Sequence, residues 1–484
     1  MVYDLLVIGG GINGTGIARD AAGRGLSTIL VERGDLAGAT SSSSSKLIHG
    51  GLRYLEHYEF KLVHEALAER EILLRTAGHL VWPARFIMPH VPELRPRWMI
   101  RIGLFLYDHL ARRSLLPGSH AVRLDSPPYS SGLKPQFKHG FIYSDCRVDD
   151  ARLVVANALD ARIRSARVLT GTECLSAKRE RDVWRVRLSN GEEIQAKAIV
   201  NAAGPWVKHV LNERLGQPSR DLVRLVRGSH ILLPQLYQGD HAFILQNDDR
   251  RVVFMIPYGD FHTLVGTTDV PQHESESAQP SFAETDYLCR AVNRYLAKPV
   301  TPHDVLWRYA GVRPLYDDGQ GDPSAVTRDY TLRVDDDAGA TPVLSVFGGK
   351  ITTYRHLAEH VLDRLKPYFP NLKRPWTHEA PLPGSDFGPQ SRVALRDAFF
   401  ARHPQIPTPT LRALFRRHGT RADQVLGDGR LGEDYGAGLT ERELRYFADQ
   451  EWARTADDVL WRRTKCGLHM SEAQRARVAQ VLGH

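Results

Sequence analysis

A glycine-rich turn near the N-terminus has the spacing that brings a backbone close to a phosphate group. Gly9, Gly11 and Gly14 match the pattern G-x-G-x-x-G, between an apolar run at 4–8 and a helical pattern. Gly9 permits a tight turn, Gly11 admits a pyrophosphate, and Gly14 lets the helix and the strand pack closely. The pyrophosphate would lie at the helix N-terminus, where unpaired N–H groups point toward it. The turn therefore predicts a dinucleotide site.

The carboxylate of Glu32 narrows the choice of dinucleotide. Glu32 closes the second predicted strand, at 27–32. A carboxylate at this place accepts hydrogen bonds from the adenosine ribose and repels a 2′-phosphate, so NADP is disfavoured. A solvated glutamate at a strand end is the alternative interpretation.

A run of hydroxyl side chains from Thr40 to Ser45 bears on the choice between FAD and NAD. A flexible linker is one interpretation, but the run is short and lies between segments with ordered patterns. Consecutive hydroxyls suit the ribityl and phosphate oxygens of an extended cofactor. Because FAD needs such contacts on both halves and NAD needs fewer, the sequence favours FAD.

The elements around the turn alternate between strand and helix. The strand at 4–8, a helix at about 13–25 and the strand at 27–32 form a βαβ unit, which implies a parallel sheet. Alternating apolar residues predict a hairpin over 183–200. Short β-like runs over 221–270 indicate an antiparallel sheet.

These patterns predict an α/β fold with a Rossmann-like FAD-binding domain, an antiparallel-sheet substrate domain and a helical C-terminal domain. Capping boxes in the last domain are expected at Thr440 with Glu443 and at Ser471 with Gln474. The expected bounds are 1–75, 140–210 and 305–370 for the FAD-binding domain, 76–139 and 211–304 for the substrate domain, and 385–484 for the helical domain.

The composition indicates a globular protein with a basic surface. The net charge of +8 favours anionic partners, although a basic surface without a specific partner explains it equally well. The four cysteines are widely spaced, so neither a disulfide framework nor a metal site is expected. We expect no signal peptide, and no apolar run approaches the roughly 20 residues that span a bilayer. Membrane contact would therefore be peripheral.

Motifs spread over nearly the whole chain resemble those of the FAD-dependent glycerol-3-phosphate dehydrogenases of the aerobic, membrane-associated type. The order of the motifs along the chain is also the same. The matching segments are 4–54, 143–153, 201–208, 227–231, 266–269, 311–315, 327–330, 345–354 and 456–465.

The resemblance implies oxidation of sn-glycerol 3-phosphate to dihydroxyacetone phosphate, with a hydride moving from C2 to flavin N5 and electrons passing to a membrane quinone. It also implies a cytoplasmic enzyme bound peripherally to the inner face of the cell membrane, on an anionic lipid surface. A homodimer is compatible with the sequence. The alternatives are an oxidase that uses O₂, an RNA-modifying FAD protein and a structural flavoprotein. No basic run interleaved with aromatic residues supports binding to nucleic acid.

A small dianionic substrate needs guanidinium or ammonium groups. Cationic side chains within the matching motifs are the candidates: Arg53, Arg313, Arg328 and Lys350. Each is otherwise a solvated surface charge. His49 is the expected general base, because a neutral imidazole suits proton abstraction near pH 7, and His230 is the second choice. Either histidine could instead orient the substrate hydroxyl or bond a buried carbonyl.

The Gly348-Gly349 pair is expected between a strand and a helix. A helix N-terminus there would stabilise the negative charge of reduced flavin, with Thr352 and Thr353 as donors in its first turn. Lys350 would then serve the flavin rather than the phosphate. A second strand end, at Asn201, is expected at the carboxyl edge of the sheet, where ligands bind.

The sequence thus predicts three sets of site residues. The expected catalytic residues are His49, Arg313 and Lys350. The expected substrate-binding residues are Arg53, Tyr54, His230, Thr268, Arg313, Arg328 and Lys350. The expected cofactor-binding residues are Gly9, Gly11, Ile12, Asn13, Gly14, Glu32, Arg33, Thr40, Ser41, Ser42, Lys46, Leu47, His49, Asn201, Ala203, Gly204, Gly348, Gly349, Lys350, Thr352 and Thr353.

The segment 95–113 mixes aromatic, aliphatic and arginine side chains. A helix packed on the core of the substrate domain is the favoured interpretation. The alternative is a helix that lies in the bilayer interface, with its arginines on lipid phosphates.

Overall fold

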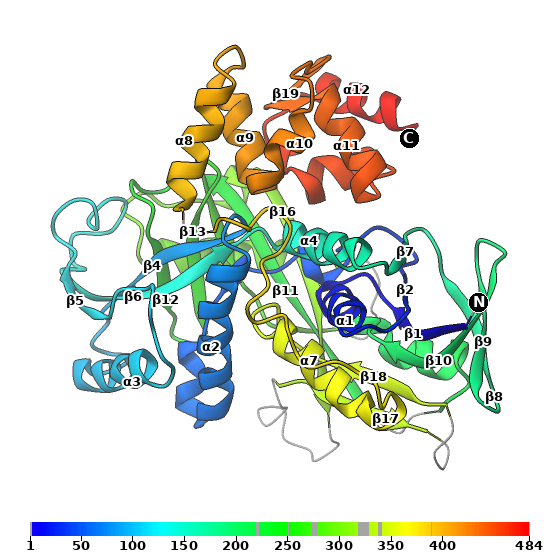
Figure 1. Ribbon diagram of the computed structural model, residues 1–484. Helices are drawn as coiled ribbons and strands as arrows, with labels where there is room; N and C mark the ends of the chain where they lie inside the picture. The colour runs from blue at the N-terminus through cyan, green and yellow to red at the C-terminus, as the bar shows by residue number, and fades with distance from the viewer. Residues whose placement is uncertain are drawn as a thin grey trace.

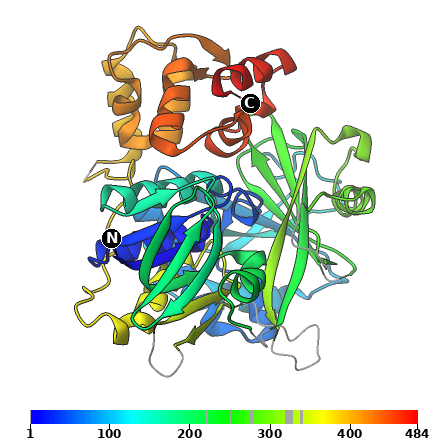
Figure 2. The same cartoon turned by 90° about the vertical axis from the view of Figure 1, so that its right-hand side faces the viewer.

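The chain folds around two β-sheets, and a helical domain covers one end of both (Figures 1 and 2). In both views the C-terminal helices, coloured orange to red, lie above the sheets. The computed structural model describes residues 2–218, 222–249, 251–272, 278–317, 329–336, 341–388 and 390–483.

The first sheet has the strand order β17-β18-β10-β1-β2-β7, and β8 and β9 extend it from β10. Strand β1 pairs parallel with β2 and β10, which confirms the βαβ unit. Strands β9 and β10 pair antiparallel, which confirms the hairpin. The strands are β1 (Val2–Ile8), β2 (Thr28–Val31), β7 (Arg167–Leu169), β8 (Cys174–Glu180), β9 (Val183–Leu188), β10 (Glu193–Asn201), β17 (Thr331–Asp335) and β18 (Val343–Phe347).

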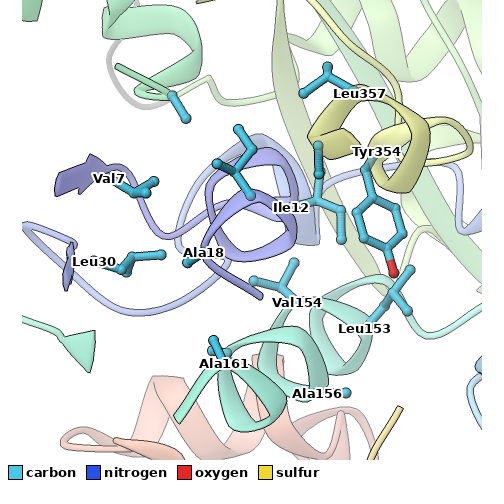
Figure 3. Close-up of a cluster of buried hydrophobic side chains, with 14 of the residues drawn as sticks. Val7, Ile12, Ala18, Leu30, Leu153, Val154, Ala156, Ala161, Tyr354 and Leu357 are labelled. Atoms are coloured by element: carbon cyan, nitrogen blue, oxygen red, sulfur yellow. The ribbon is translucent and has the colours of Figure 1, made fainter. Parts of the chain in front are cut away.

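Helix α1 (Ile12–Gly23) packs on this sheet beside α4 (Asp150–Ile163) and α7 (Tyr354–Leu365) (Figure 3). Successive side chains of a strand point to opposite faces of its sheet. Val7 accordingly joins the core shared with these helices, whereas Ile8 joins the core beneath β8 and β9. The buried run that predicted the strand is thus buried on both faces, which holds the glycine turn firmly.

The second sheet is mostly antiparallel, with the order β15-β11-β14-β13-β12-β4-β6-β3; β16 pairs with β11, and β5 pairs with β6. Its strands are β3 (Leu47–Ile48), β4 (Val81–Pro89), β5 (His120–Arg123), β6 (His139–Val148), β11 (Leu222–Pro234), β12 (Ala242–Gln246), β13 (Val252–Tyr258), β14 (His262–Gly266), β15 (Val270–Gln272) and β16 (Trp307–Asp317).

Strands β6 and β16 lie in the second sheet, although the expected FAD-binding domain includes both. The domain bounds expected at 140 and 305 therefore do not coincide with the division between the two sheets. Strand β6 pairs with β4 over its whole length after His139, and β16 pairs with β11 from Trp307 to Asp317. These ladders satisfy the backbone groups of both strands. Local patterns identified the strands but not the partners with which they pair.

Helices cover both faces of the second sheet. Val63 of α2 (Phe60–Thr76) and Leu104 of α3 (Arg97–His109) share one core with this sheet. Val292 of α6 (Phe282–Asn293) joins the core on the other face. The short helix α5 (Val207–His209) comes after β10 along the chain.

The C-terminal domain has its own hydrophobic core and confirms the expected helical domain. Ser471 and Gln474 form a reciprocal capping box, whereas Thr440 accepts from the Glu443 amide without the reciprocal bond. Its elements are α8 (Arg392–Arg402), α9 (Thr408–His418), α10 (Ala422–Leu426), β19 (Asp434–Gly436), β20 (Leu439–Thr440), α11 (Glu441–Glu451), a π-helical turn (Asp458–Arg463) and α12 (Glu472–Leu482).

Among the described helices, none is both long and apolar enough to cross a membrane. The four cysteines are buried and carry free thiols.

Candidate active site

A cavity of about 860 Å³ is lined by residues from both sheets and from the C-terminal domain. This volume is in the upper part of the range for ligand sites, roughly 300–1,000 Å³. We call the part lined by Gly9, Gly11 and Glu32 the glycine-turn end. The part lined by Arg53, Arg313 and Lys350 is the cation end.

The glycine turn leaves no space for larger residues. A Cβ on Gly14 would lie 1.9 Å from the Gly9 carbonyl oxygen, and Gly9 adopts a φ of +113°. Gly11 is the N-cap of α1, and the next amide, of Ile12, donates to Ser41 Oγ at 3.0 Å. The N-terminal N–H groups of a helix attract anions. The turn has the geometry of a pyrophosphate site.

Glu32 lines the cavity and ties the turn to the loop after β2. Its carboxylate accepts from the Gly10 amide at 2.6 Å and from the Gly34 amide at 2.8 Å. Burial raises the pKa of Glu32, and both amide hydrogen bonds oppose that rise. The carboxylate therefore holds the backbone of Gly10 and Gly34 in place, and it also lines the cavity.

The turn after β18 meets the N-terminus of α1. Asn13 Nδ2 donates to the Gly348 carbonyl oxygen at 3.2 Å, and Gly348 and Gly349 adopt positive φ angles of +79° and +99°. Asn13 Oδ1 is buried without a hydrogen-bond partner among the described residues. A buried acceptor of this kind fits a ligand hydroxyl.

Helix α7 begins at Tyr354, later than expected. Thr352 and Thr353 therefore precede the first helical turn, and the prediction that they are donors within it is wrong. The two positive φ angles keep the backbone out of the helical region over Gly348-Gly349, which delays the start of the helix.

The hydroxyl run lies along the cavity, with Ser41, Ser43, Ser44 and Ser45 on its wall. It is an ordered segment rather than a flexible linker. Lys46 does not line the cavity. Its ammonium is buried and bonds Asp150 at 2.8 Å and the Ser42 carbonyl oxygen at 2.8 Å, so it supports the run from behind.

Three cationic side chains from distant segments, Arg53, Arg313 and Lys350, line the cavity. Arg313 donates to the Thr268 carbonyl oxygen at 2.9 Å and to Asp269 at 2.8 Å. The Lys350 ammonium lies 4.0 Å from the centre of the Tyr54 ring. Arg53 forms no hydrogen bond or ion pair with any residue described by the structure. Its guanidinium is therefore available to an anion.

Both candidate histidines line the cavity, in different surroundings. Burial lowers the pKa of His49, Asp145 opposes the shift, and Lys350 adds to it. Burial lowers the pKa of His230 to about 3. His230 Nε2 lies 2.9 Å from Ser45 Oγ, and its ring stacks on Tyr309. His230 is thus neutral, and Ser45 and Tyr309 hold its ring in place.

Several expected site residues lie outside the cavity wall, and Arg328 lies outside the described residues. Asn201 donates to the Val207 carbonyl oxygen at 2.8 Å, and Thr268 donates to Glu284 at 2.9 Å. Both support the wall from behind. The described residues in this group are Gly14, Ser42, Lys46, Asn201, Thr268 and Thr353.

Sequence reasoning missed other lining residues. Asp269 is in a matching motif, so a signal for it existed, but its pairing with Arg313 depends on β16 lying beside β11. Phe254, which packs edge-to-face on His49, had no signal beyond its place in a strand. Arg462 of the C-terminal domain lines the cavity too.

Comparison with known proteins agrees with this geometry. A family described as FAD dependent oxidoreductase matches residues 4–355, and the C-terminal domain of alpha-glycerophosphate oxidase matches residues 375–483. The chain is 52% identical to a glycerol-3-phosphate dehydrogenase of Pseudomonas aeruginosa, over 99% of this chain and 95% of that protein. It is 50% identical to the aerobic glycerol-3-phosphate dehydrogenase of Escherichia coli, over 99% and 97%. It is 48% identical to a D-erythritol 1-phosphate dehydrogenase of Brucella abortus, over 98% and 96%.

Solved structures show the same fold. The glycerol-3-phosphate dehydrogenase from Bacillus halodurans complexed with FAD has a TM-score of 0.75 and 26% identity, over 100% of this chain and 94% of that chain. The L-alpha-glycerophosphate oxidase from Mycoplasma pneumoniae, with a TM-score of 0.64 and 18% identity, covers 79% of this chain and 99% of its own. The cofactor is FAD, and the chain belongs to the family of FAD-dependent glycerol-3-phosphate dehydrogenases.

Proposed function

We propose that the chain oxidises sn-glycerol 3-phosphate to dihydroxyacetone phosphate and passes the electrons to a membrane quinone. The observation that carries this proposal is that Arg53, Arg313 and Lys350 all line the cavity that begins at the glycine turn. FAD, when bound, supplies the hydride acceptor at N5. The names of the two relatives at 50–52% identity support the choice of substrate.

The phosphate group is bound by the cation end. Arg53 offers a guanidinium that has no acidic partner among the described residues. Arg313 is already held by Asp269 and Thr268, so it presents its remaining N–H groups in a fixed direction. Guanidinium forks suit the planar pairs of oxygens on a phosphate. Arg328 stays a prediction from the resemblance.

The C2 hydroxyl loses its proton to His49. Because burial lowers the pKa of this imidazole, the neutral form predominates at pH 7 and can accept a proton. The His49 amide donates to Thr352 Oγ1 at 3.3 Å, which ties the backbone of this residue to the turn after β18.

The substrate assignment is tested by anaerobic addition of sn-glycerol 3-phosphate to the FAD-bound protein. The flavin absorbance should bleach within the mixing time of a stopped-flow instrument. D-erythritol 1-phosphate, the substrate named for the Brucella relative, is the matched comparison, and it should bleach the flavin more slowly. FAD-bound protein that does not bleach with glycerol 3-phosphate would refute the assignment.

The electron acceptor is tested separately. Apolar side chains of β12 and β13, among them Ile244, Val252 and Phe254, also line the cavity and suit an apolar acceptor. In air, turnover should reduce a soluble quinone analogue and form little hydrogen peroxide. One peroxide for each substrate oxidised would instead identify an oxidase.

Helix α3 supports the proposal of peripheral membrane binding at the inner face of the cell membrane. It buries Ile100, Leu104 and Tyr107 against the second sheet but leaves Trp98 and Phe105 62% and 61% exposed. It therefore packs on the core, as expected, and also presents an apolar face. Exposed apolar patches mark interaction surfaces. Figure 1 shows α3 at the edge of the molecule opposite the C-terminal domain.

A further inference from the structure

None of the site residues expected from the sequence lies in the matching motif at 456–465. In the fold, Asp458–Arg463 forms a π-helical turn of the C-terminal domain, and π-helical turns are frequent at functional sites. Asp458 and Arg462 line the FAD cavity. The C-terminal domain therefore contributes part of the wall that surrounds the cofactor.

This turn holds the loop after β2 through Asp35. Arg462 Nε lies 2.5 Å from Asp35 Oδ2, and Arg463 donates to both Asp35 oxygens at 2.6 and 2.7 Å. The Arg463 side chain is 0% exposed and that of Asp35 is 7% exposed. Buried charge-assisted bonds of this kind are strong and directional. Because Asp35 follows Glu32 by three residues, the clamp is at the glycine-turn end.

One nitrogen of the Arg462 guanidinium has no hydrogen-bond partner among the described residues. Its Nη2 bonds Asp458, and its Nε bonds Asp35. Its Nη1 forms no hydrogen bond within the described part of the chain, and the side chain lines the cavity. The acidic pair of Asp35 and Asp458 balances the charges of Arg462 and Arg463. The spare N–H groups therefore suit a polar acceptor on the ligand.

We propose that Arg462 is a cofactor-binding residue and that the C-terminal domain holds the adenosine half of FAD through the 458–463 turn. Two further contacts keep the turn in place. Trp461 stacks on Trp307 of β16, with ring centres 5.2 Å apart. Lys465, just after the turn, reaches Asp149 at 3.4 Å. The turn is thus held against β16 and against the N-terminus of α4, which makes Arg462 a rigid donor.

The test measures release of FAD from the holoenzyme by the recovery of flavin fluorescence after dilution, without substrate. Arg462→Met should speed release roughly 10- to 100-fold, the effect of losing one hydrogen bond to a charged group. Arg462→Lys should give an intermediate rate. Arg445→Met is the matched control, because this exposed arginine of α11 pairs with Glu441 on the surface, and its release rate should match that of the unaltered protein.

A second measurement locates the effect in the cavity. ADP, which carries the adenosine half alone, should compete with FAD for the emptied protein, and Arg462→Met should weaken this competition by the same factor as FAD binding. Arg445→Met should leave ADP competition unchanged.

Release rates of Arg462→Met equal to those of the control would overturn the proposal. A lower melting temperature with unchanged FAD and ADP binding would also overturn it, because the residue would then be structural only. If Arg462→Met does not fold, Arg462→Lys decides by the same measurements. None of these readouts depends on the substrate, so they are independent of the proposed function.

Discussion

The two ends of the cavity are built in different ways. The glycine-turn end depends on backbone: Gly9, Gly11 and Gly14 lie within six residues of sequence, and a Cβ added to Gly9 or Gly14 would strike a carbonyl group. The cation end depends on side chains from segments that are far apart, Arg53, Arg313 and Lys350. Backbone sites fail when any atom is added, whereas side-chain sites can be weakened by degrees. The variants below test this difference.

The largest effect is expected at the glycine turn. Gly14→Ala places a Cβ 1.9 Å from the Gly9 carbonyl oxygen, so the turn must open. We expect protein without FAD and a loss of at least about 1–3 kcal/mol in the free energy of unfolding, as for other overpacked sites. Flavin content and urea unfolding measure both. Gly103→Ala is the control, because its added Cβ would meet no described atom within 4 Å beyond the neighbouring backbone of its own helix.

His49→Asn should lower kcat roughly 10²- to 10⁴-fold and leave FAD bound, because only the proton acceptor is lost. Burial lowers the pKa of His49, so the neutral base persists below pH 6.5. In the pH profile of kcat/KM, the midpoint of the acid limb should therefore lie below pH 6.5. A midpoint at or above pH 6.5 would contradict the assignment. So would a kcat of His49→Asn equal to that of His378→Asn, the exposed control.

Arg53→Ala should raise KM for the phosphorylated substrate roughly 10- to 100-fold, from the loss of one charge-assisted hydrogen bond. FAD affinity should stay the same, which separates the two ends of the cavity. Steady-state kinetics and flavin release measure the two quantities. Arg53→Lys should recover part of the loss, because it restores the charge without the fork. Equal weakening of FAD and substrate would show that the two ends are not independent.

The smallest effect on catalysis is expected at α3. Changing Trp98, Ile102 and Phe105 to Ser should reduce flotation with anionic liposomes roughly tenfold or more, because large apolar side chains leave the interface. Turnover with a soluble quinone analogue should be unchanged. Phe261→Ser with Phe282→Ser is the control, since both side chains are 69% exposed elsewhere. Unchanged flotation of the triple variant would refute membrane contact by α3.

The sequence by itself determined the glycine-turn end and most of the secondary structure. The turn at Gly9–Gly14, the hairpin over 183–200 and the strand before Gly348 follow from contacts between near neighbours, which leave a pattern in the sequence. Arg53 and Arg313 were expected at the substrate because they lie in motifs that resemble those of a family, not because spacing implied it.

Only the tertiary structure decided which segments meet. It paired β16 with β11, set Arg313 beside Asp269, and turned Lys46 away from the cavity toward Asp150. It also brought Arg462 to Asp35, two residues separated by most of the chain. Such contacts depend on how sheets and domains pack, and a buried ion pair between distant segments leaves no periodic signal along the sequence.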